Sequence, residues 1–267
     1  MRLASLRGAL GVVAMAELAW SLLFYFVPHF ALGALGRTVV DPVIARQYPL
    51  YLASAAIAYG IAAIDPRRYR SVVWICVAQR GIELVVATID WRAHAISTSA
   101  LIGVALIESA VALALVILVR GSGASAARPP ALDPRDRGLV RMLRAFGGLE
   151  VFWFLASTIF VQLGARLLGW KLLDPYSTQQ QGIALLVIGL VSLCAASDVA
   201  RYRLFVIVPV ASQLIGMVNA FNEIRLGTIG WNGAAVQWTI ESAIVGGFIY
   251  FMRHRIGVVK ASPLLAE

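Results

Sequence analysis

The chain has few charged residues and only two cysteines. Charged side chains make up 14% of its 267 residues, while hydrophobic side chains make up 60%. Soluble domains carry about 25% charged and about 45–50% apolar residues, so this composition excludes an ordinary water-soluble globule. Cys76 and Cys194 fall inside apolar runs, which favours small buried side chains over a disulfide or a metal site.

Recognisable catalytic and cofactor motifs are also missing. The sequence has no Cys-x-x-Cys pair, no glycine-rich phosphate loop and no nucleophile elbow. Its three histidines share no depth in a helical bundle, which argues against bis-histidine haem ligation. No catalytic residue and no metal site is predicted from these patterns, and the cofactor stays unknown. An enzyme is the less favoured interpretation and stays open, because it would need a reactive group that the sequence does not identify. The net charge of +9 does not indicate nucleic-acid binding, because a soluble basic face is absent.

What the chain does contain is a series of apolar runs long enough to cross a membrane, which needs about 20 helical residues. Because these runs are apolar on all sides, helices are favoured over a β-barrel. The predicted fold class is an all-α polytopic membrane protein with eight transmembrane helices. We expect the first run to be retained as a span rather than removed as a signal peptide. The predicted spans are 6–28, 45–64, 71–89, 98–120, 140–163, 180–197, 204–222 and 232–253.

The two halves of the chain repeat each other. A shift of 133 positions aligns them without a gap, and roughly a quarter of the aligned residues are identical. The identities include residue types that composition alone would not align, such as Glu17 with Glu150, Trp20 with Trp153, and IESA at 107–110 and 240–243. We predict a tandem duplication with four-helix repeats at 1–120 and 139–258, a cytoplasmic linker at 121–138 and a C-terminal tail at 259–267.

An even number of spans gives both repeats one orientation, so the repeats are expected to be parallel. Most of the 23 Lys and Arg residues lie in connections on the side of the N-terminus, which predicts cytoplasmic N- and C-termini. The Arg-rich composition favours a bacterial plasma (inner) membrane. The turns DPRRYR, at 65–70, and DVARYR, at 198–203, belong to the cytoplasmic side. Their arginines are expected to contact lipid phosphates: Arg67, Arg68, Arg70, Arg201 and Arg203.

Ionisable residues in the middle of the spans are the main candidates for a site. Glu17, Arg80, Glu83 and Glu108 share one depth by helical rise, close to the predicted midplane. A charge at a helix centre costs about 2.5–3.5 kcal/mol on the insertion scale, so such groups pair or face water. Three carboxyl groups with one guanidinium predict that at least one carboxyl holds a proton.

The second repeat keeps Glu150 and Glu241 but has Gln213 at the position of Arg80 and Gly216 at the position of Glu83. The two acids are therefore expected to be neutral and hydrogen-bonded to each other, to Gln213 or to Gln237. The alternative is that they hold a cation or a ligand amine. Trp20 and Trp153 follow the two glutamates by three residues, which predicts either an aromatic wall beside a pocket or core packing.

Two interpretations of these polar residues stay open, interhelical hydrogen bonding without a ligand and a functional polar cavity. The stretch YGIAAIDPRRYRSVVWICVAQRGIEL, at 59–84, resembles the DoxX-like group of four-helix bacterial membrane proteins. That resemblance implies a basic residue in mid-helix, the position of Arg80, and a similarity to subunits of quinone-linked oxidoreductases. The second repeat departs from the pattern, since Gln213 stands there.

We therefore expect a membrane protein that contacts membrane lipids and binds a lipophilic ligand, such as a quinone or a lipid, or assists a membrane protein complex. The alternative is a proton-coupled small-molecule transporter that uses the intramembrane glutamates.

Overall fold

The computed structural model describes residues 2–41, 44–121, 136–168, 172, 174–225, 227 and 230–256. The secondary structure of this part is helical, with no strand, as predicted for an all-α protein. Most of the predicted linker, from 122 to 135, and the predicted tail at 259–267 lie outside the described residues.

The helices of the first half confirm the predicted boundaries to within a few residues. They are α1 (Arg2–Phe26), the short α2 (Pro28–Ala34), α3 (Ile44–Ile64), α4 (Arg70–Arg92) and α5 (Thr98–Arg120). Helix α2 begins at Pro28, whose fixed φ suits the first turn of a helix. Helix α5 begins after Ser97, whose hydroxyl accepts a hydrogen bond from the backbone N–H of Ala100.

The helices of the second half are interrupted more often than those of the first. Its elements are α6 (Arg137–Phe154), the π-helix η2 (Leu155–Ile159), α7 (Val161–Leu168), α8 (Pro175–Ser197), α9 (Val199–Tyr202), the 3-10 helix η3 (Arg203–Val206), α10 (Ile207–Arg225) and α11 (Trp231–Ile256). The prediction of one helix over 140–163 is wrong. Ser157 donates its hydroxyl to the carbonyl of Trp153, and Thr158 donates to the carbonyl of Gln179 on α8. Such side-chain bonds to the backbone loosen the helical ladder and accompany the π-helix here.

Six segments in the described part of the chain are long and apolar enough to cross a membrane. They are Leu3–Phe26, Ile44–Ile64, Arg70–Arg92, Thr98–Arg120, Pro175–Ser197 and Val199–Arg225. Helix α6 is more charged than these six segments, because it carries three arginines and Glu150 within 18 residues. Helix α11 is 26 residues long and carries several polar residues in its first half. Large apolar side chains are exposed on many of these helices, as expected where lipid is the solvent. The protein is thus a helical, multi-pass membrane protein.

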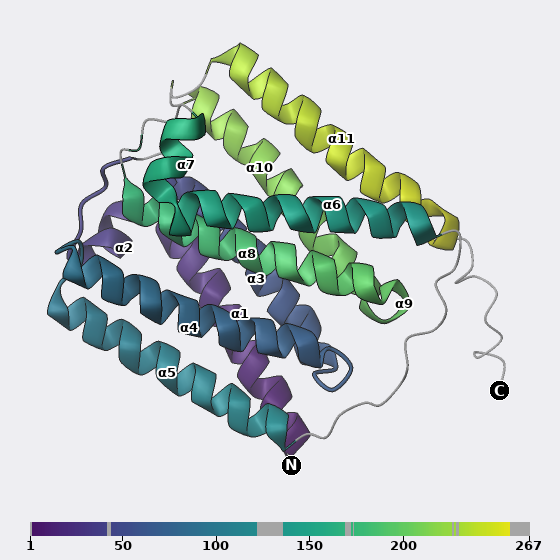
Figure 1. Ribbon diagram of the computed structural model, residues 1–267, viewed down its shortest axis with the longest axis horizontal. Helices are drawn as coiled ribbons and strands as arrows, with labels where there is room; N and C mark the ends of the chain where they lie inside the picture. Colours follow the sequence, from purple (N-terminus) through teal and green to yellow (C-terminus); the bar gives the residue numbers. More distant parts are fainter. Residues whose placement is uncertain are drawn as a thin grey trace.

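Helices α3 and α8 pack against each other in the middle of the bundle (Figure 1). Helix α1 packs on α3, and α6 packs on α8. The pairs α4–α5 and α10–α11 lie on the outside, where α4 contacts α8 and α10 contacts α3. The two halves therefore contact each other through α3 and α4 of the first half and α8 and α10 of the second.

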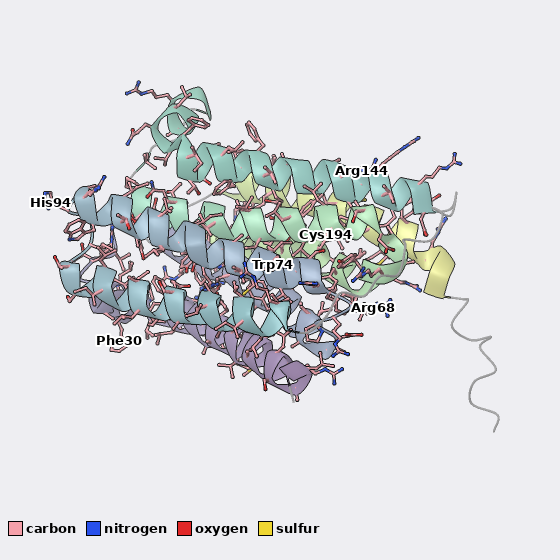
Figure 2. The ribbon with its side chains drawn as sticks, turned by 60° about the horizontal axis from the view of Figure 1, so that its bottom comes forward. Phe30, Arg68, Trp74, His94, Arg144 and Cys194 are labelled. Atoms are coloured by element: carbon pink, nitrogen blue, oxygen red, sulfur yellow. The ribbon has the colours of Figure 1, made fainter. Side chains whose placement is uncertain are left out.

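One apolar core joins the two halves. It includes Leu10 and Tyr59 from the first half together with Phe146 and Phe205 from the second, all buried. The basic turns lie at one end of the bundle, whereas the connections after α1 and α4 lie at the other. In Figure 2, Arg68 marks the first end and Phe30 and His94 mark the second.

Candidate functional site

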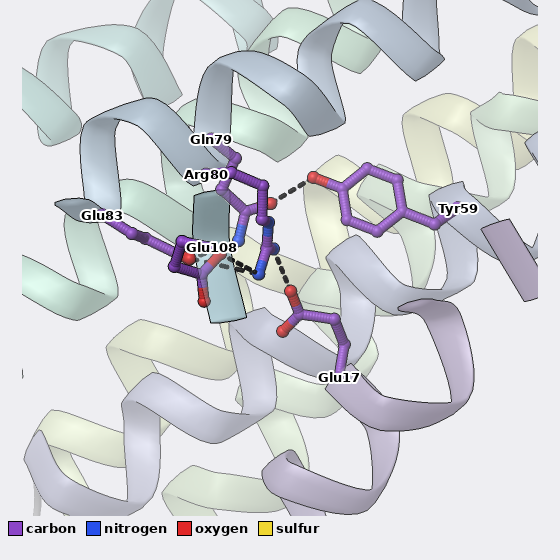
Figure 3. A network of polar contacts seen from close by, with 6 residues as sticks. All are labelled: Glu17, Tyr59, Gln79, Arg80, Glu83 and Glu108. Atoms are coloured by element: carbon purple, nitrogen blue, oxygen red, sulfur yellow. Dashed lines mark hydrogen bonds and ion pairs between the residues drawn. The ribbon is translucent and has the colours of Figure 1, made fainter. Parts of the chain in front are cut away.

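The first polar cluster is built around Arg80, which lies on α4 with its side chain only 8% exposed. One guanidinium nitrogen donates to Glu17 on α1. The other lies 3.0 Å from a carboxylate oxygen of Glu108 on α5 and 3.1 Å from one of Glu83 on α4 (Figure 3). The structure therefore brings together the four first-half residues that the shared depth predicted.

Two further residues complete this cluster, and the sequence reasoning missed both. The Gln79 amide donates to Glu83 at 2.6 Å, and the Tyr59 hydroxyl from α3 donates to the Gln79 carbonyl oxygen. Gln79 precedes Arg80 directly and lies at the same depth, so polarity within an apolar span was a usable signal for it. Tyr59 carried no such signal, because tyrosine is common in cores. The completed cluster connects four helices, α1, α3, α4 and α5.

This arrangement favours a structural role for the first cluster. Removing one partner from a buried ion pair leaves an uncompensated charge and costs about 3–5 kcal/mol. Arg80 reaches all three carboxylates, and its ring of partners holds α1, α4 and α5 together in the apolar interior. Only its Nε atom lacks a hydrogen-bond partner.

The second cluster has a different geometry. Glu241 on α11 accepts a hydrogen bond from Gln237 at 3.0 Å, and Gln237 also lies 3.3 Å from the carbonyl of Gly216 on α10. The expected bond between Glu150 and Glu241 is not formed, and the expected bonds to Gln213 are not formed either. Glu150 is 5% exposed, and Gln213 and Glu241 are 8% exposed. Among the described residues, neither Glu150 nor Glu241 forms an ion pair, and of these four residues only Glu241 and Gln237 are joined by a side-chain hydrogen bond.

Comparison with protein-family models, curated proteins and solved structures finds no match to this chain. The described residues also contain no group of three His, Cys, Asp or Glu side chains that could hold a metal ion.

Trp20 and Trp153 align under the shift of 133 but have different aromatic neighbours. Trp20 packs edge-on against Phe24, with ring centroids 5.0 Å apart, in a small core that includes Tyr48. Trp153 lies edge-on to its neighbour Phe152, with centroids 5.5 Å apart. The geometry places Trp20 in core packing.

The arginines of the two basic turns make contacts that the sequence did not predict. Arg68 donates to the carbonyl of Ala200 at 3.2 Å, and Arg201 donates to the carbonyl of Arg68 at 2.5 Å. Under the shift of 133, Arg68 aligns with Arg201, so the two turns clasp each other reciprocally. We name this pair of contacts the arginine clasp.

Each turn of the arginine clasp is built in the same way. The Asp65 carboxylate accepts from the backbone N–H of Arg68, and the Asp198 carboxylate accepts from that of Arg201. Each of the two guanidinium groups also lies 5.5 Å from the centroid of the tyrosine ring that follows it. Arg67 is exposed, whereas Arg70 and Arg203 are half-buried at the same end. Contact of these five arginines with lipid phosphates stays a prediction.

Further polar contacts join the halves near the opposite end. Gln47 on α3 donates to Glu223 on α10 at 2.8 Å. Arg37 lies 3.6 Å from Asp174, the residue that caps α8, and stacks over the Tyr176 ring. The predicted span 204–222 placed Glu223 just outside the membrane segment, yet α10 continues to Arg225 and buries it.

Proposed function

We propose that this chain is a bacterial plasma-membrane protein that binds a lipophilic ligand, such as a quinone or a lipid, beside its buried glutamates, or that supports a partner complex. One observation carries the proposal. Glu17 and Glu108 pair with an internal arginine, whereas Glu150 and Glu241 are buried and form no ion pair with any described residue. Burying acids without a charged partner is costly, so their retention points to a role beyond stability.

We further propose that the bundle is a duplicated pair of parallel four-helix repeats with eight spans. The contacts between the long helices support this, because those of one half have counterparts in the other under the shift of 133. The pairs α1–α3 and α6–α8 correspond, as do α4–α5 and α10–α11, and the central pair α3–α8 corresponds to itself. The arginine clasp is reciprocal in the same sense.

The eight-span arrangement requires α6 and α11 to cross the membrane as well. Both are supported by their neighbours, since α6 lies along the apolar α8 and α11 lies along α10. The basic turns would then be cytoplasmic together with both termini. A reporter enzyme fused after residue 256 tests the orientation, because it should be active only when it faces the cytoplasm.

The resemblance to DoxX-like proteins is consistent with a ligand related to respiratory quinones, and we include it in the proposal. It applies to the first repeat, where Arg80 stands at the basic position. Gln213 breaks the pattern in the second repeat, so the two clusters are expected to differ in what they hold.

Native mass spectrometry of the detergent-extracted protein tests the proposal. We expect a co-purified small molecule that is lost in Glu150→Leu and kept in the control Leu149→Val, which changes an exposed neighbour. If the wild type carries no small molecule, and Glu150→Leu is more stable with no loss of cellular phenotype, the proposal fails.

A second candidate function is a proton-coupled small-molecule transporter that uses Glu17, Glu108, Glu150 and Glu241. The partnerless carboxylate oxygen of Glu241 favours it, because a proton carrier must exchange its proton with a pathway. Solute flux in proteoliposomes that does not respond to a pH gradient would rule against this candidate.

A further inference from the structure

We propose that the exposed face of α6 binds the phosphate group of an anionic phospholipid in the cytoplasmic leaflet, through Arg137, Arg141 and Arg144. This site is separate from the buried glutamates and from the basic turns. The inference goes beyond the proposed function but rests on one part of it, the crossing of the membrane by α6 with the basic turns on the cytoplasmic side.

The three arginines lie on one face of α6. Their spacing of four and three residues places them one above the other along the helix. All three are exposed, whereas Leu139 and Leu143, which lie between them in the sequence, are buried in the core. In Figure 2, Arg144 lies on the outer side of the bundle. The arginines therefore form a basic stripe on the surface of α6 that faces away from α8.

No counter-ion for this stripe comes from the part of the chain that the structure describes. The ion pairs there involve only Arg37 and Arg80, and none of the three guanidinium groups forms a hydrogen bond with another described residue. The carboxyl group of α6 itself, Glu150, is 5% exposed and belongs to the opposite, buried face. The positive charge of the stripe is thus left for a group outside the protein.

The stripe reaches into the level of the membrane. Helix α6 packs along α8, which is long and apolar enough to be a span. A Cβ atom on Gly147 would lie 2.8 Å from the carbonyl oxygen of Gly189, so these two residues share one level. By helical rise, Gly189 lies about 12 Å from the end of α8 at Ser197, and Arg144 lies about 4.5 Å nearer that end than Gly147. Arg144 is therefore about 7 Å inside the end of α8, and its long side chain can extend from there to the lipid phosphates.

The first half shows that the fold does not require these arginines. Helix α1 packs on α3 as α6 packs on α8, and the shift of 133 aligns the three positions with Ala4, Gly8 and Gly11. Charges on a membrane-facing surface are costly and mark functional sites. Because the same packing forms with small residues at these positions, the stripe points to the binding of an anion.

The shape of the ligand follows from the rest of this face. Beyond Arg144, towards the middle of the membrane, the face continues with Gly148 and Phe152. A Cβ atom on Gly148 would have nothing within 4 Å, and Phe152 is 51% exposed. Guanidinium groups bind phosphate oxygens in pairs, and an open apolar surface accommodates an acyl chain. A phospholipid has both parts in this order, whereas free phosphate would use only the arginines.

The test uses phosphatidylglycerol as the probe and the full chain in a neutral detergent. We expect the lipid to raise the unfolding midpoint of the wild type saturably, by about 3 °C at ten times its dissociation constant. Inorganic phosphate at the same concentration should give no rise. The double variant Arg141→Gln, Arg144→Gln should weaken lipid binding by about tenfold or more, because it removes two of the three cations.

A matched control removes two exposed arginines of the first half at the same end of the bundle, in Arg7→Gln, Arg120→Gln. The net charge changes equally, and the affinity for the lipid should stay at the wild-type value. An equal loss in both double variants would show a diffuse attraction to positive charge and overturns the inference, as does the absence of a midpoint rise in the wild type. If the α6 variant does not fold, Arg144→Gln alone decides, and an unchanged affinity overturns the inference.

The crossing of α6 is tested separately, with a cysteine on the exposed part of α7. Arg166→Cys should react with a membrane-impermeant maleimide added to spheroplasts, and the wild type is the control because Cys76 is buried and Cys194 half-buried. Labelling only after lysis would overturn the proposed eight spans together with this inference. Labelling from outside, combined with full lipid affinity in the α6 variant, would reject the lipid site alone.

Discussion

Replacing Arg80 by glutamine, the residue that the second half has at this position, should strongly destabilise the bundle. The change removes two ionic hydrogen bonds to acids on α1 and α5, and it leaves those acids without a cation. Gln79 would continue to hold Glu83 through its bond of 2.6 Å. The penalty therefore comes mainly from Glu17 and Glu108, and we expect a loss of about 3 kcal/mol in the free energy of unfolding, the lower end for breaking a buried ion pair.

Unfolding in detergent, followed by far-UV circular dichroism against added denaturant, measures this loss. Arg144→Gln provides the control, because Arg144 is exposed on α6 and its loss should change the free energy by less than about 0.5 kcal/mol. Adding Glu17→Gln to Arg80→Gln should recover part of the loss, since one uncompensated acid is then removed. An Arg80→Gln loss below about 1 kcal/mol would refute the argument that Arg80 holds the three helices together.

Three further predictions follow from close contacts. Gly147→Ala should lower the free energy of unfolding by about 1–3 kcal/mol, because its Cβ would lie 2.8 Å from a backbone carbonyl of α8. The control Gly148→Ala has nothing within 4 Å of its Cβ and should be neutral or slightly stabilising. Equal effects of the two variants in denaturant unfolding would contradict this. Tyr59→Phe should cost about 1–2 kcal/mol by the same measurement, because it leaves the amide oxygen that accepts its hydroxyl unpaired. Arg68→Ala and Arg201→Ala should each cost about 0.5–1.5 kcal/mol and depend little on salt, since the acceptors are neutral carbonyls; a loss that disappears at high salt would indicate an ionic role instead.

Much of the fold was accessible from local properties of the chain. Length and apolarity predicted α3, α4 and α5 nearly to the residue, because the requirement to span a membrane acts on each segment separately. The gathering of Glu17, Arg80 and Glu108 could also be predicted. Helical rise gives a common depth, and an arginine in an apolar bundle must find carboxylates at that depth.

Other features depend on how the helices meet. The π-helix after α6 forms where the Thr158 hydroxyl donates to the carbonyl of Gln179 on α8, and this hydroxyl reaches that carbonyl only once the two helices are packed. Contact of the basic turns with lipid phosphates stays a prediction, and the structure adds that Arg68 and Arg201 bond to the opposite turn. Their spacing in the sequence could not reveal this, because it follows from the packing of α3 against α8.

Helix positions and the common level of Glu17, Arg80 and Glu108 along their helices could be predicted from the sequence, because they rest on local hydropathy and on a fixed rise along the helix. Which acids share a cation was not readable in this way. Arg80 reaches Glu17 and Glu108, while Glu150 and Glu241 remain apart, and that difference depends on the relative placement of three helices. Side-chain partners are set by distances in space, and distant parts of the chain acquire those distances only when the bundle assembles.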